Sequence, residues 1–508
     1  LNVTDGFTSE DPLGDRNLFG CGYNDTVLGT VEIHVYGTPD IGSSHIYGGG
    51  STENQLGNSW PVRILNQANK ECALYITYDV PSEINAAATH HGINAGSDDS
   101  IPMTIQGNVL VEVLGENMDY IVMDNENYED RNCTIDGACT IRIAGGGIIG
   151  QIQNNWKHFK DNGAADAVND RVIYDGCGTA DAPQISGYLY GFGEVVLKNN
   201  ANVLVSSLAT GDFDWTQKPF YNVYGLTVEE GSTLKTTDAQ AYIYGDVVVS
   251  GVWEQAYNNA ADYNDLWVKG TLTVGSKGQL ISLGTTNIKG DVTSLGTIAL
   301  MNPALFQANY TGTGAELRLP AVAEGGNYNG TDDGGDIPLC IYGVSSGTTT
   351  VNTVSADNWQ TLQTPKLGDN YITGGKQDDA TPAQGVFLLG NADALADGLY
   401  LKRVDDPYVS ESGDQDFMWQ VAKGITVIFD KNGGDTEAEP KAITVECIAG
   451  QTEYTPGIPP TPPIRAGYEF TGWNTKADGT GDAYGADTKI DHSMTVYAQW
   501  KEIIAKYT

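Results

Sequence analysis

Short runs of alternating apolar and polar residues fill the stretch from Gly225 to Leu300. It reads GLTVEEGSTLKTTDAQAYIYGDVVVSGVWEQ and, after an Asn-rich loop, continues as WVKGTLTVGSKGQLISLGTTNIKGDVTSLGTIAL. Alternation with a period of two predicts β-strands, and a glycine stands between nearly every pair of runs. The glycines recur every 20 to 25 residues, as at Gly245, Gly270 and Gly290. A period of this length predicts stacked coils of strands, the arrangement of a solenoid.

The spacing of apolar residues repeats from one predicted coil to the next. The aligned sets are Val195, Leu197 and Val203; Leu226, Val228 and Leu234; and, with one residue inserted, Leu272, Val274 and Leu280. In a parallel β-helix, inward residues of successive coils stack about 4.8 Å apart and build a dry core. We therefore expect a right-handed parallel β-helix whose corner glycines and asparagines adopt the left-handed conformation. Antiparallel sandwiches are the alternative, but their Asn-Gly and Asp-Gly hairpin signals are sparse here.

Less regular strands are expected before this stretch. The run Thr30–Gly37 alternates apolar and polar residues, and further strands are expected at Cys72–Val80, Asn108–Gly115 and Cys139–Ile152. The segment Asn154–Asp170 is the one that favours a short helix. The loops between these strands are rich in Asn and Asp, and loops that leave a solenoid usually gather on one face, often the binding face.

Two parts of the chain resemble known solenoid proteins. Aromatic-Gly-Gly turns alternate with V-x-I-x-V strands over residues 18–50, which resembles the repeat-rich surface proteins of gut Bacteroidetes and clostridia that are regarded as β-helical adhesins. Cys21 stands where those repeats usually carry glycine. Residues 302–420, through Asn309–Ala315 and Phe417–Trp419, resemble the end of pertactin-like passengers. Since a solenoid end exposes its core and strand edges, we expect this block to form the terminal coils and a cap.

The C-terminal segment carries a third resemblance. The blocks Ile425–Gly434, Gly467–Trp473 and Met494–Trp500, with a Pro-rich stretch after the first, resemble the Listeria–Bacteroides repeat, the B-repeat of internalin-type surface proteins. The resemblance implies a small β-grasp-like module of the stalk or adhesion type. The residues that carry it are Phe429, Asn432, Gly433, Gly434, Gly467, Tyr468, Phe470, Gly472, Trp473, Tyr497 and Trp500.

Four aromatic residues of this segment have enough area to form the core of a small domain, namely Phe470, Trp473, Tyr497 and Trp500. The alternative is that these rings form an exposed platform for a sugar. The core interpretation is favoured, because a module of this size needs the aromatic residues inside.

The charge balance excludes two classes of partner. The chain has 65 Asp and Glu residues against 27 Lys and Arg, a net charge of −38. Such a surface repels phosphate backbones and anionic lipid headgroups, so we expect no nucleic acid and no direct membrane insertion. No apolar run approaches the roughly 18 residues of a membrane span. The first residue is Leu1 and not Met, and we expect an extracellular or surface protein exported by a removed N-terminal signal.

Seven cysteines are scattered without a CxxC pair, at Cys21, Cys72, Cys133, Cys139, Cys177, Cys340 and Cys447. A local bridge between Cys133 and Cys139 is conceivable across the intervening turn. Buried or partly buried thiols are the favoured interpretation.

Candidate chemistry is limited. His90 and His91 are adjacent, and neighbours on a strand point to opposite faces, so they form a poor metal site. The sequence has no HExxH, GxSxG, Walker or dinucleotide motif. We expect no catalytic residues and no cofactor. Calcium at the loop Met123–Gly137 is the alternative, and its candidate ligands are Asp124, Glu126, Glu129, Asp130 and Asp136.

The expected organisation is an N-terminal extension (1–17), a solenoid with loop insertions (18–301), terminal coils and a cap (302–420), the repeat (421–501) and a tail (502–508). The expected function is that of a non-enzymatic surface protein for adhesion or scaffolding, whose partner is a glycan or protein of a host or neighbouring cell. One alternative is the protomer of an extracellular filament, in which the partner is a copy of the chain. The other is a polysaccharide lyase or glycoside hydrolase, since both occur on β-helices and fold alone does not decide function.

Overall fold

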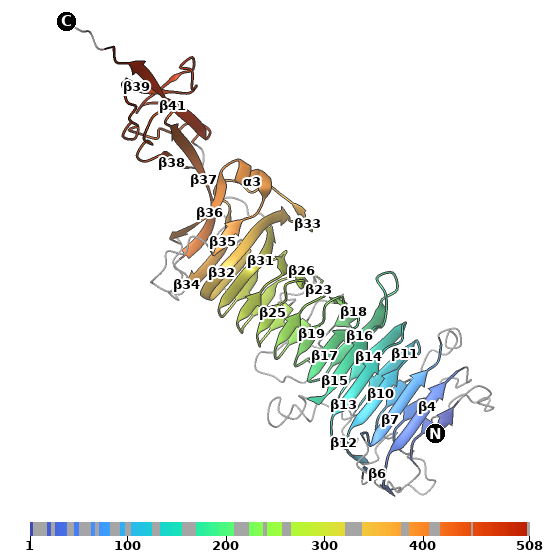
Figure 1. The fold of residues 1–508 in the computed structure, drawn as a ribbon. Helices are drawn as coiled ribbons and strands as arrows, with labels where there is room; N and C mark the ends of the chain where they lie inside the picture. The colour runs from blue at the N-terminus through green and yellow to red at the C-terminus, as the bar shows by residue number, and fades with distance from the viewer. Residues whose placement is uncertain are drawn as a thin grey trace.

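The computed structural model describes most of the chain, in segments. These are residues 1–3, 18–21, 26–37, 45–49, 62–66, 71–81, 92–96, 103–123, 133–154, 169–207, 223–236, 241–256, 266–320, 338–376, 386–405, 417–448 and 451–504. Their strands stack into a long rod that leads into a smaller β domain at the C-terminal end (Figure 1). The expected all-β solenoid is therefore confirmed.

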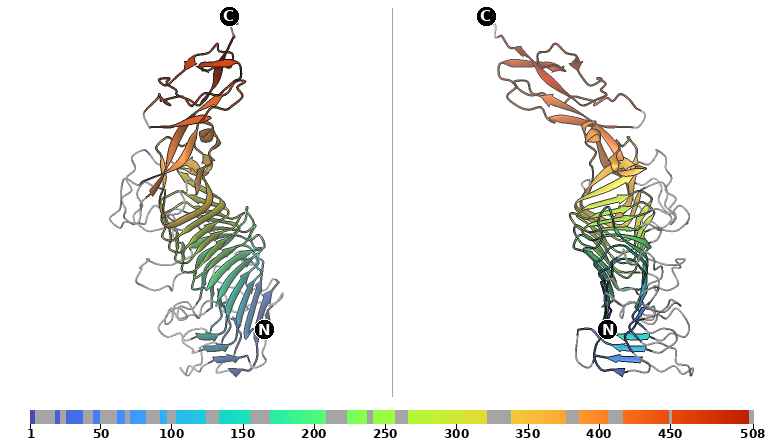
Figure 2. Two further views of the ribbon diagram at one scale, coloured as in Figure 1. Left: turned by 60° about the vertical axis from the view of Figure 1, so that its left-hand side comes forward. Right: turned by 90° about the vertical axis from the view of Figure 1, so that its right-hand side faces the viewer.

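Parallel strands from successive coils form two long stacks. The first stack runs β1 (Asn2–Val3), β4 (Val31–Tyr36), β7 (Leu74–Asp79), β10 (Val109–Val113), β13 (Cys139–Ile143), β15 (Arg171–Asp175), β17 (Glu194–Lys198), β19 (Leu226–Val228), β22 (Val247–Val249), β25 (Leu272–Val274), β28 (Val292–Ser294) and β31 (Tyr310–Pro320). The second runs β2 (Leu18–Phe19), β5 (Ile46–Tyr47), β8 (Gly92–Asn94), β11 (Met118–Val122), β14 (Ile148–Gln153), β16 (Gln184–Tyr190), β18 (Asn202–Ser207), β20 (Thr233–Thr236), β23 (Val252–Gln255), β26 (Gln279–Ser282), β29 (Thr297–Leu300), β31, β32 (Leu339–Ser355) and β35 (Phe387–Leu389). The views in Figure 2 show the strands stacked along the rod.

Shorter ladders complete the coils. The third stack runs β21 (Ala241–Ile243), β24 (Leu266–Val268), β27 (Thr286–Ile288), β30 (Ala304–Phe306), β32 and β34 (Asn370–Lys376). Nearer the N-terminus, a separate parallel sheet contains β3 (Thr26–Val27), β6 (Val62–Leu65), β9 (Met103–Gln106) and β12 (Cys133–Asp136). The run expected as one strand from Cys139 to Ile152 is two strands, β13 and β14, with Ala144–Gly147 between them.

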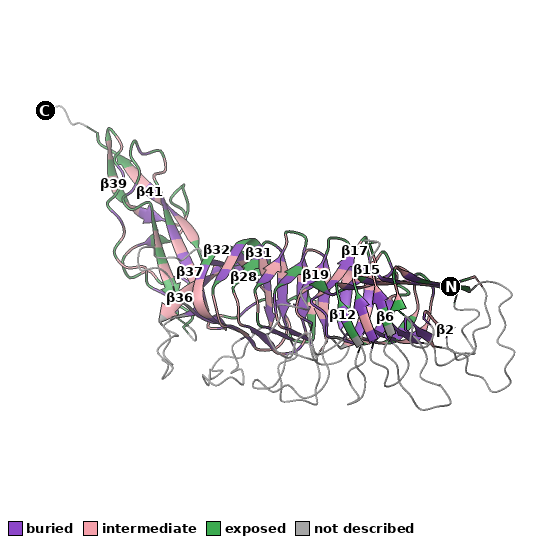
Figure 3. Ribbon diagram, turned by 90° about the horizontal axis from the view of Figure 1, so that it is seen from below, coloured by how far each residue is buried: buried purple, intermediate pink, exposed green. Residues whose placement is uncertain are grey.

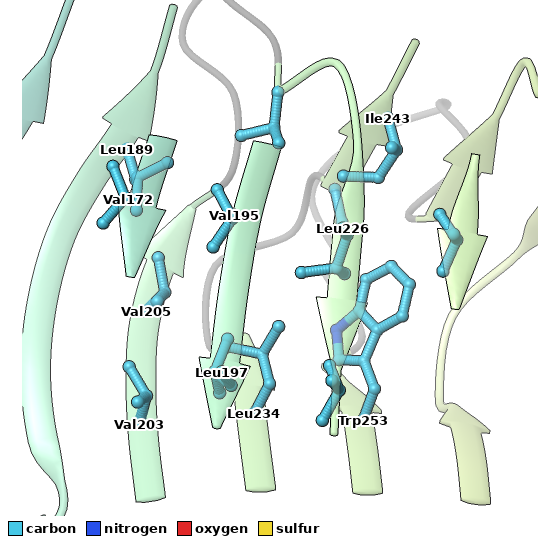
Figure 4. Close-up of a cluster of buried hydrophobic side chains, with 14 of the residues drawn as sticks. Val172, Leu189, Val195, Leu197, Val203, Val205, Leu226, Leu234, Ile243 and Trp253 are labelled. Carbon is cyan, nitrogen blue, oxygen red and sulfur yellow. The ribbon is translucent and has the colours of Figure 1, made fainter. Parts of the chain in front are cut away.

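The core is a set of columns of aliphatic side chains along the rod axis. Val195 pairs with Leu226, Leu197 with Val228 and Val203 with Leu234, which confirms the alignment made from the sequence. A further coil contributes Trp253 between Leu234 and Leu280. These side chains are almost fully buried. Figure 4 shows Val195, Leu226 and Trp253 among the buried side chains of the core, and Figure 3 shows buried positions along the strands of the rod. Since each buried aliphatic side chain stabilises the fold by roughly 1.5–3 kcal/mol, the columns provide the main driving force for stacking.

The glycine period marks a corner where successive coils approach closely. A Cβ added to Gly270 would lie 2.2 Å from the Gly245 carbonyl oxygen, and one added to Gly290 would lie 2.3 Å from that of Gly270. These glycines do not have a positive φ, so the expected left-handed conformation is wrong for them. Their small size is needed because the backbone of the preceding coil occupies the space of a side chain. Left-handed residues occur instead at another corner, at Asn200 (φ 62°) and Gly231 (φ 84°).

An aromatic column closes the C-terminal end of the solenoid. Phe306 stacks on Tyr310, Tyr310 on Phe387, and Phe387 meets Trp419 edge-on at a centroid distance of 5.3 Å. Trp419 is fully buried and lies on β37 (Phe417–Asp430), which pairs with β34 and with β36 (Leu399–Asp405). The short helix α3 (Ala392–Ala396) and the hairpin strand β33 (Asn358–Leu362) complete this region. These elements form the C-terminal end of the solenoid.

The repeat module begins on the same strand that ends the cap. Beyond Gly424, β37 pairs with β38 (Ala442–Cys447) and, in parallel, with β41 (Met494–Glu502). β39 (Tyr468–Asn474) lies antiparallel to β41 and pairs with β40 (Ala483–Tyr484). The boundary expected between residues 420 and 421 therefore falls inside a continuous strand.

The N-terminal boundary also differs from expectation. Asn2 and Val3 form β1, which adds to the first stack beside β4, and the backbone N–H of His34 donates to the Leu1 carbonyl oxygen. The first three residues therefore belong to the solenoid. The segment expected as a helix, Asn154–Asp170, lies largely outside the described residues.

The corner glycines generate a stability prediction. Replacement of Gly270 by Ala places a Cβ against the Gly245 backbone, which cannot move without separating two coils. We expect a loss of about 1–3 kcal/mol in the free energy of unfolding, the usual cost of overpacking, measured by urea denaturation.

Gly29→Ala is the matched control. Gly29 has no atom within 4 Å of its added Cβ among the described residues and has no positive φ. We expect a change below about 0.5 kcal/mol. Equal losses in the two variants would contradict the close-approach explanation.

Candidate binding surfaces and the repeat module

A chain of charged and polar side chains crosses the outer face of the first stack. The Arg142 guanidinium donates through Nη1 to Glu112 Oε1 and through Nε to Asp175 Oδ2, both at 2.8 Å. The Tyr75 hydroxyl donates to the other oxygen of Glu112. Asn199 Nδ2 donates to Asp175 Oδ1 at 2.6 Å, and Lys198 Nζ lies 3.6 Å from Asp175. We call this set, Tyr75, Glu112, Arg142, Asp175, Lys198 and Asn199, the ion ladder.

The ion ladder links five successive strands of the stack, β7, β10, β13, β15 and β17. Its two carboxylates are largely covered, with 17% of the Glu112 side chain and 12% of the Asp175 side chain exposed. The hydrogen bond from Asn199, with those from Arg142, holds the pKa of Asp175 below its usual value against the opposing effect of burial. Hydrogen bonds to Asp175 and Glu112 raise the pKa of Arg142. Arg142 is therefore unsuited to act as a base.

Aromatic and amide side chains lie in one row on the outer face of the second stack. Tyr120 pairs with Gln151, and Gln151 with Tyr188, on β11, β14 and β16. The neighbours Ile121, Ile152 and Leu189 are fully buried in the core, so alternation turns the row outward. His45 stacks on Tyr120 at a centroid distance of 5.4 Å. We call His45, Tyr120, Gln151 and Tyr188 the aromatic row.

The aromatic row combines flat apolar rings with hydrogen-bonding groups. Gln151 Nε2 donates to Gln153 Oε1 at 2.9 Å, and 46% of Tyr188 is exposed. Such amphipathic surfaces suit contact with a glycan or a polypeptide. The sequence did not reveal the row, because 31 residues separate Tyr120 from Gln151 and 37 separate Gln151 from Tyr188. Because the loops between these strands differ in length, the sequence alone does not show which residues of β11, β14 and β16 pair with one another.

The residues proposed from the sequence as ligands fall mostly outside the described part of the chain. This holds for Asp124, Glu126, Glu129 and Asp130. His90 and His91, which the sequence indicates to be a poor metal site, also lie outside the described residues. Asp136 is described and is exposed on β12. Among the described residues, no group of three or more His, Cys, Asp or Glu side chains is placed to hold a metal ion.

Five cysteines of the described part of the chain are buried thiols, namely Cys21, Cys139, Cys177, Cys340 and Cys447. Cys139 is one of them, so the conceivable bridge from Cys133 to Cys139 is not formed. The physical reason is topological, because Cys133 lies in the separate four-stranded sheet and Cys139 in the first stack. Burial raises the pKa of the Cys177 thiol to about 12, which makes it a weak nucleophile at neutral pH.

The signature residues of the C-terminal segment build a turn and a core. Asn432 has a φ of 43°, and its Nδ2 donates to the carbonyl oxygens of Ala477 and Ala498. Trp500 Nε1 donates to the carbonyl oxygens of Lys431 and Asn432. The turn at Asn432–Gly434 is thereby tied to β41 and to the loop after β39.

The core of the segment differs in part from expectation. Phe429 meets Trp473 edge-on at 4.9 Å and Tyr484 at 5.7 Å, and these three rings are buried. Phe470 and Trp500 pack against this core while partly exposed. Tyr497 does not join it, because its neighbours Val496 and Ala498 point inward and alternation turns Tyr497 to the other face of β41.

Comparison with known families identifies the C-terminal segment. Residues 426–499 match the family model of the Listeria-Bacteroides repeat domain. No curated protein and no solved structure matches the chain. The Listeria–Bacteroides repeat is typical of extracellular and surface proteins, and this chain carries one. In the described part of the chain, no helix has the length and apolar character needed to cross a membrane.

The lowered pKa of Asp175 generates a prediction for the pH dependence of stability. A carboxyl group whose folded-state pKa lies below its unfolded value of about 3.9 stabilises the fold above that pH. This stabilisation is lost as the pH falls through the folded-state pKa. We expect Asp175→Asn to cost about 1–3 kcal/mol at neutral pH, because Arg142 loses a charged partner. The difference from the unaltered protein should shrink below about pH 4, as measured by urea denaturation across the acid range.

Glu230→Gln is the control for this experiment. Glu230 pairs with Lys277, and their side chains are 62% and 70% exposed. We expect this variant to stay within about 0.5 kcal/mol of the unaltered protein. A stability difference for Asp175→Asn that does not depend on pH would contradict the role of the charge.

Proposed function

We propose that the chain is a non-enzymatic adhesion protein that acts at or outside the cell surface. In this proposal the solenoid presents a binding surface along a stiff rod, and the Listeria–Bacteroides repeat connects the rod to the rest of the surface assembly. The partner is a glycan or a protein of a host or neighbouring cell. The observation that carries the proposal is the way in which β37 joins the two parts.

β37 contributes to two hydrophobic cores. Trp419 and Val421 lie in the core of the solenoid, and Ile425, Val427 and Phe429 lie in the core of the repeat. A strand that is buried at both ends leaves no flexible linker between the parts. A stiff connection supports a role in bearing load or in holding a binding surface at a distance.

Further contacts brace the joint. Lys402 Nζ on β36 lies 2.7 Å from both carboxylate oxygens of Glu446 on β38, and these two strands flank β37 on opposite edges. Leu367, from the cap, packs against the core of the repeat. The Glu446 carboxylate raises the pKa of Lys402, so this pair remains charged at neutral pH.

The ion pairs of two arginines with carboxylates support the proposal that the chain is not an enzyme. A lyase on this scaffold needs an arginine or lysine that can accept a proton. Arg142 is bound to two carboxylates, and Arg171 Nε lies 3.1 Å from Glu194. These pairs stabilise the protonated state of each arginine and oppose a role as base.

The adhesion proposal predicts that the aromatic row contributes to binding. We expect the purified full chain to bind members of an array of host and plant glycans and surface proteins. Tyr188→Ser should weaken that binding by about tenfold or more, because tyrosine is enriched among the few contact residues whose truncation costs about 2 kcal/mol or more. The array signal measured over a range of protein concentrations gives the apparent affinity.

Tyr36→Ser is the matched control, since Tyr36 lies on the first stack and is 44% exposed, against 46% for Tyr188. It should leave binding unchanged. Absence of binding to every array member would overturn the adhesion proposal. Release of sugar products from the same polysaccharides would overturn its non-enzymatic part.

One observation favours assembly into a filament as a second candidate. At the N-terminal end of the rod, β1, β2 and β3 each pair with only one other strand among the described residues. Their outer edges carry backbone groups that a strand from another copy of the chain satisfies.

The filament candidate predicts that deletion of Leu1–Gly14 abolishes assembly, because it removes β1 from the end of the stack. Negative-stain microscopy of the two purified proteins is the measurement, with matched far-UV circular dichroism as the control for folding. If the unaltered chain stays monomeric at high concentration, the filament candidate fails and adhesion by single rods is favoured.

A further inference from the structure

A proline-rich segment runs along the surface of the repeat between β38 and β39. It reads IPPTPPIR from Ile458 to Arg465, and we call it the proline segment. Every residue from Ile458 to Pro463 is a proline or directly precedes one, and both positions favour extended, polyproline II backbone. The structure has neither helix nor strand at residues 458–465, apart from an isolated bridge at Thr461. The proline segment therefore forms a short polyproline II helix, which has three residues per turn.

The burial of its residues follows the same period of three. Pro460 and Pro463 are buried, whereas Ile458, Thr461 and Ile464 are exposed. The exposed fraction is 83% for Ile458 and 67% for Ile464. Since residues three apart share one face of a polyproline II helix, one face of the proline segment lies against the repeat and another faces solvent.

Hydrogen bonds hold the proline segment in place. The backbone N–H of Thr461 donates to the Glu439 carbonyl oxygen at 3.0 Å, and that of Glu439 donates to the Thr461 carbonyl oxygen at 3.2 Å. The backbone N–H of Ile464 donates to Thr436 Oγ1 at 2.8 Å. The backbone is thus ordered before any partner binds, which reduces the conformational entropy that is lost on binding.

The charge of this part of the chain differs from that of the whole. Residues 455–468 contain one arginine, Arg465, and no Asp or Glu, in a chain whose net charge is −38. The Arg465 guanidinium lies over the Tyr468 ring, 3.8 Å from its centroid, and makes no ion pair with a carboxylate among the described residues. A ring attracts a cation without neutralising it, so the end of the proline segment is locally positive.

We propose that the proline segment docks in a groove lined by aromatic side chains on a partner protein. Such grooves recognise preformed polyproline II helices, because the helix places its apolar residues between the rings at little cost in entropy. Ile458 and Ile464 supply exposed apolar contacts, and Arg465 pairs with a carboxylate at the end of the groove. The inference rests on the proposed function for its setting, since it names the contact through which the repeat connects the rod to the surface assembly.

The test uses the full chain and a panel of purified SH3 and WW domains, whose aromatic-lined grooves are of this kind. Biolayer interferometry with the chain immobilised gives the dissociation constants. We expect panel members to bind and a free polyproline peptide to compete. The double variant Ile458→Ser/Ile464→Ser should weaken that binding at least about tenfold, because two apolar contacts are lost.

The double variant Ile503→Ser/Ile504→Ser is the matched control. These two isoleucines directly follow β41 in the same repeat and are 62% and 80% exposed. The control should leave binding to the panel unchanged. Equal loss in the two double variants would overturn the inference.

The salt dependence of binding tests the ion pair assigned to Arg465. Binding to the panel should weaken as salt rises, and Arg465→Gln should remove most of that dependence, because the charged contact is lost. A salt dependence that is the same in Arg465→Gln and in the unaltered chain would contradict this ion pair.

Failure of the inference is distinguishable from failure of the adhesion proposal. If no panel member binds, the inference is overturned, and the adhesion proposal stands where array binding depends on Tyr188. If panel members bind through the proline segment but no array member binds, the inference stands and the adhesion proposal fails.

Discussion

The structure depends on one spacing, the distance of about 4.8 Å between hydrogen-bonded parallel strands of successive coils. At that distance, residues in register on neighbouring coils contact one another directly. On the inside, this contact selects aliphatic columns such as Val195, Leu226 and Leu272. At the corner before the first stack it excludes side chains, so Gly245, Gly270 and Gly290 follow one another there. On the outside it brings Glu112, Arg142 and Asp175 into one ladder.

The same spacing explains why the two ends of the rod differ. Stacking can continue until something covers the last coil. At the C-terminal end, Trp419 closes an aromatic column, and the strand that carries it runs on into the repeat. A load applied to the repeat is therefore transmitted through backbone hydrogen bonds to the solenoid. At the N-terminal end, β1, β2 and β3 each pair with one other strand among the described residues.

The three stacks of strands present different side chains on the outer faces of the rod. The first stack carries the ion ladder, the second carries the aromatic row, and the third carries Lys269 over the ring of Tyr244. A solenoid produces such faces readily, because a residue type repeated once per coil becomes a continuous line on the surface. The adhesion proposal uses this property, because a line of residues along the rod can make many weak contacts with an extended ligand.

The sequence by itself determined the solenoid where the coils have nearly equal length. Between residues 193 and 300 the apolar residues and glycines recur with little variation, so the columns and the corner were predictable. It also determined the repeat module, because the turn at Asn432–Gly434 and the aromatic residues carry the signature of the family. The sequence did not determine the continuous β37, because Lys423 and Gly424 read equally well as a linker.

Only the tertiary structure decided the outer surfaces. The residues of the ion ladder and of the aromatic row are separated by loops of unequal length, and the register emerges only after the coils stack. The tertiary structure also decided why the corner positions are glycine. The sequence shows that these positions lack a side chain. It does not show whether the cause is a left-handed φ or the backbone of a neighbouring coil. The position of Tyr497 was also not determined by the sequence. Val496 and Ala498 are buried, so strand alternation turns Tyr497 to the other face of β41. Local pattern therefore specified which coils form, and contact between coils specified what each face presents.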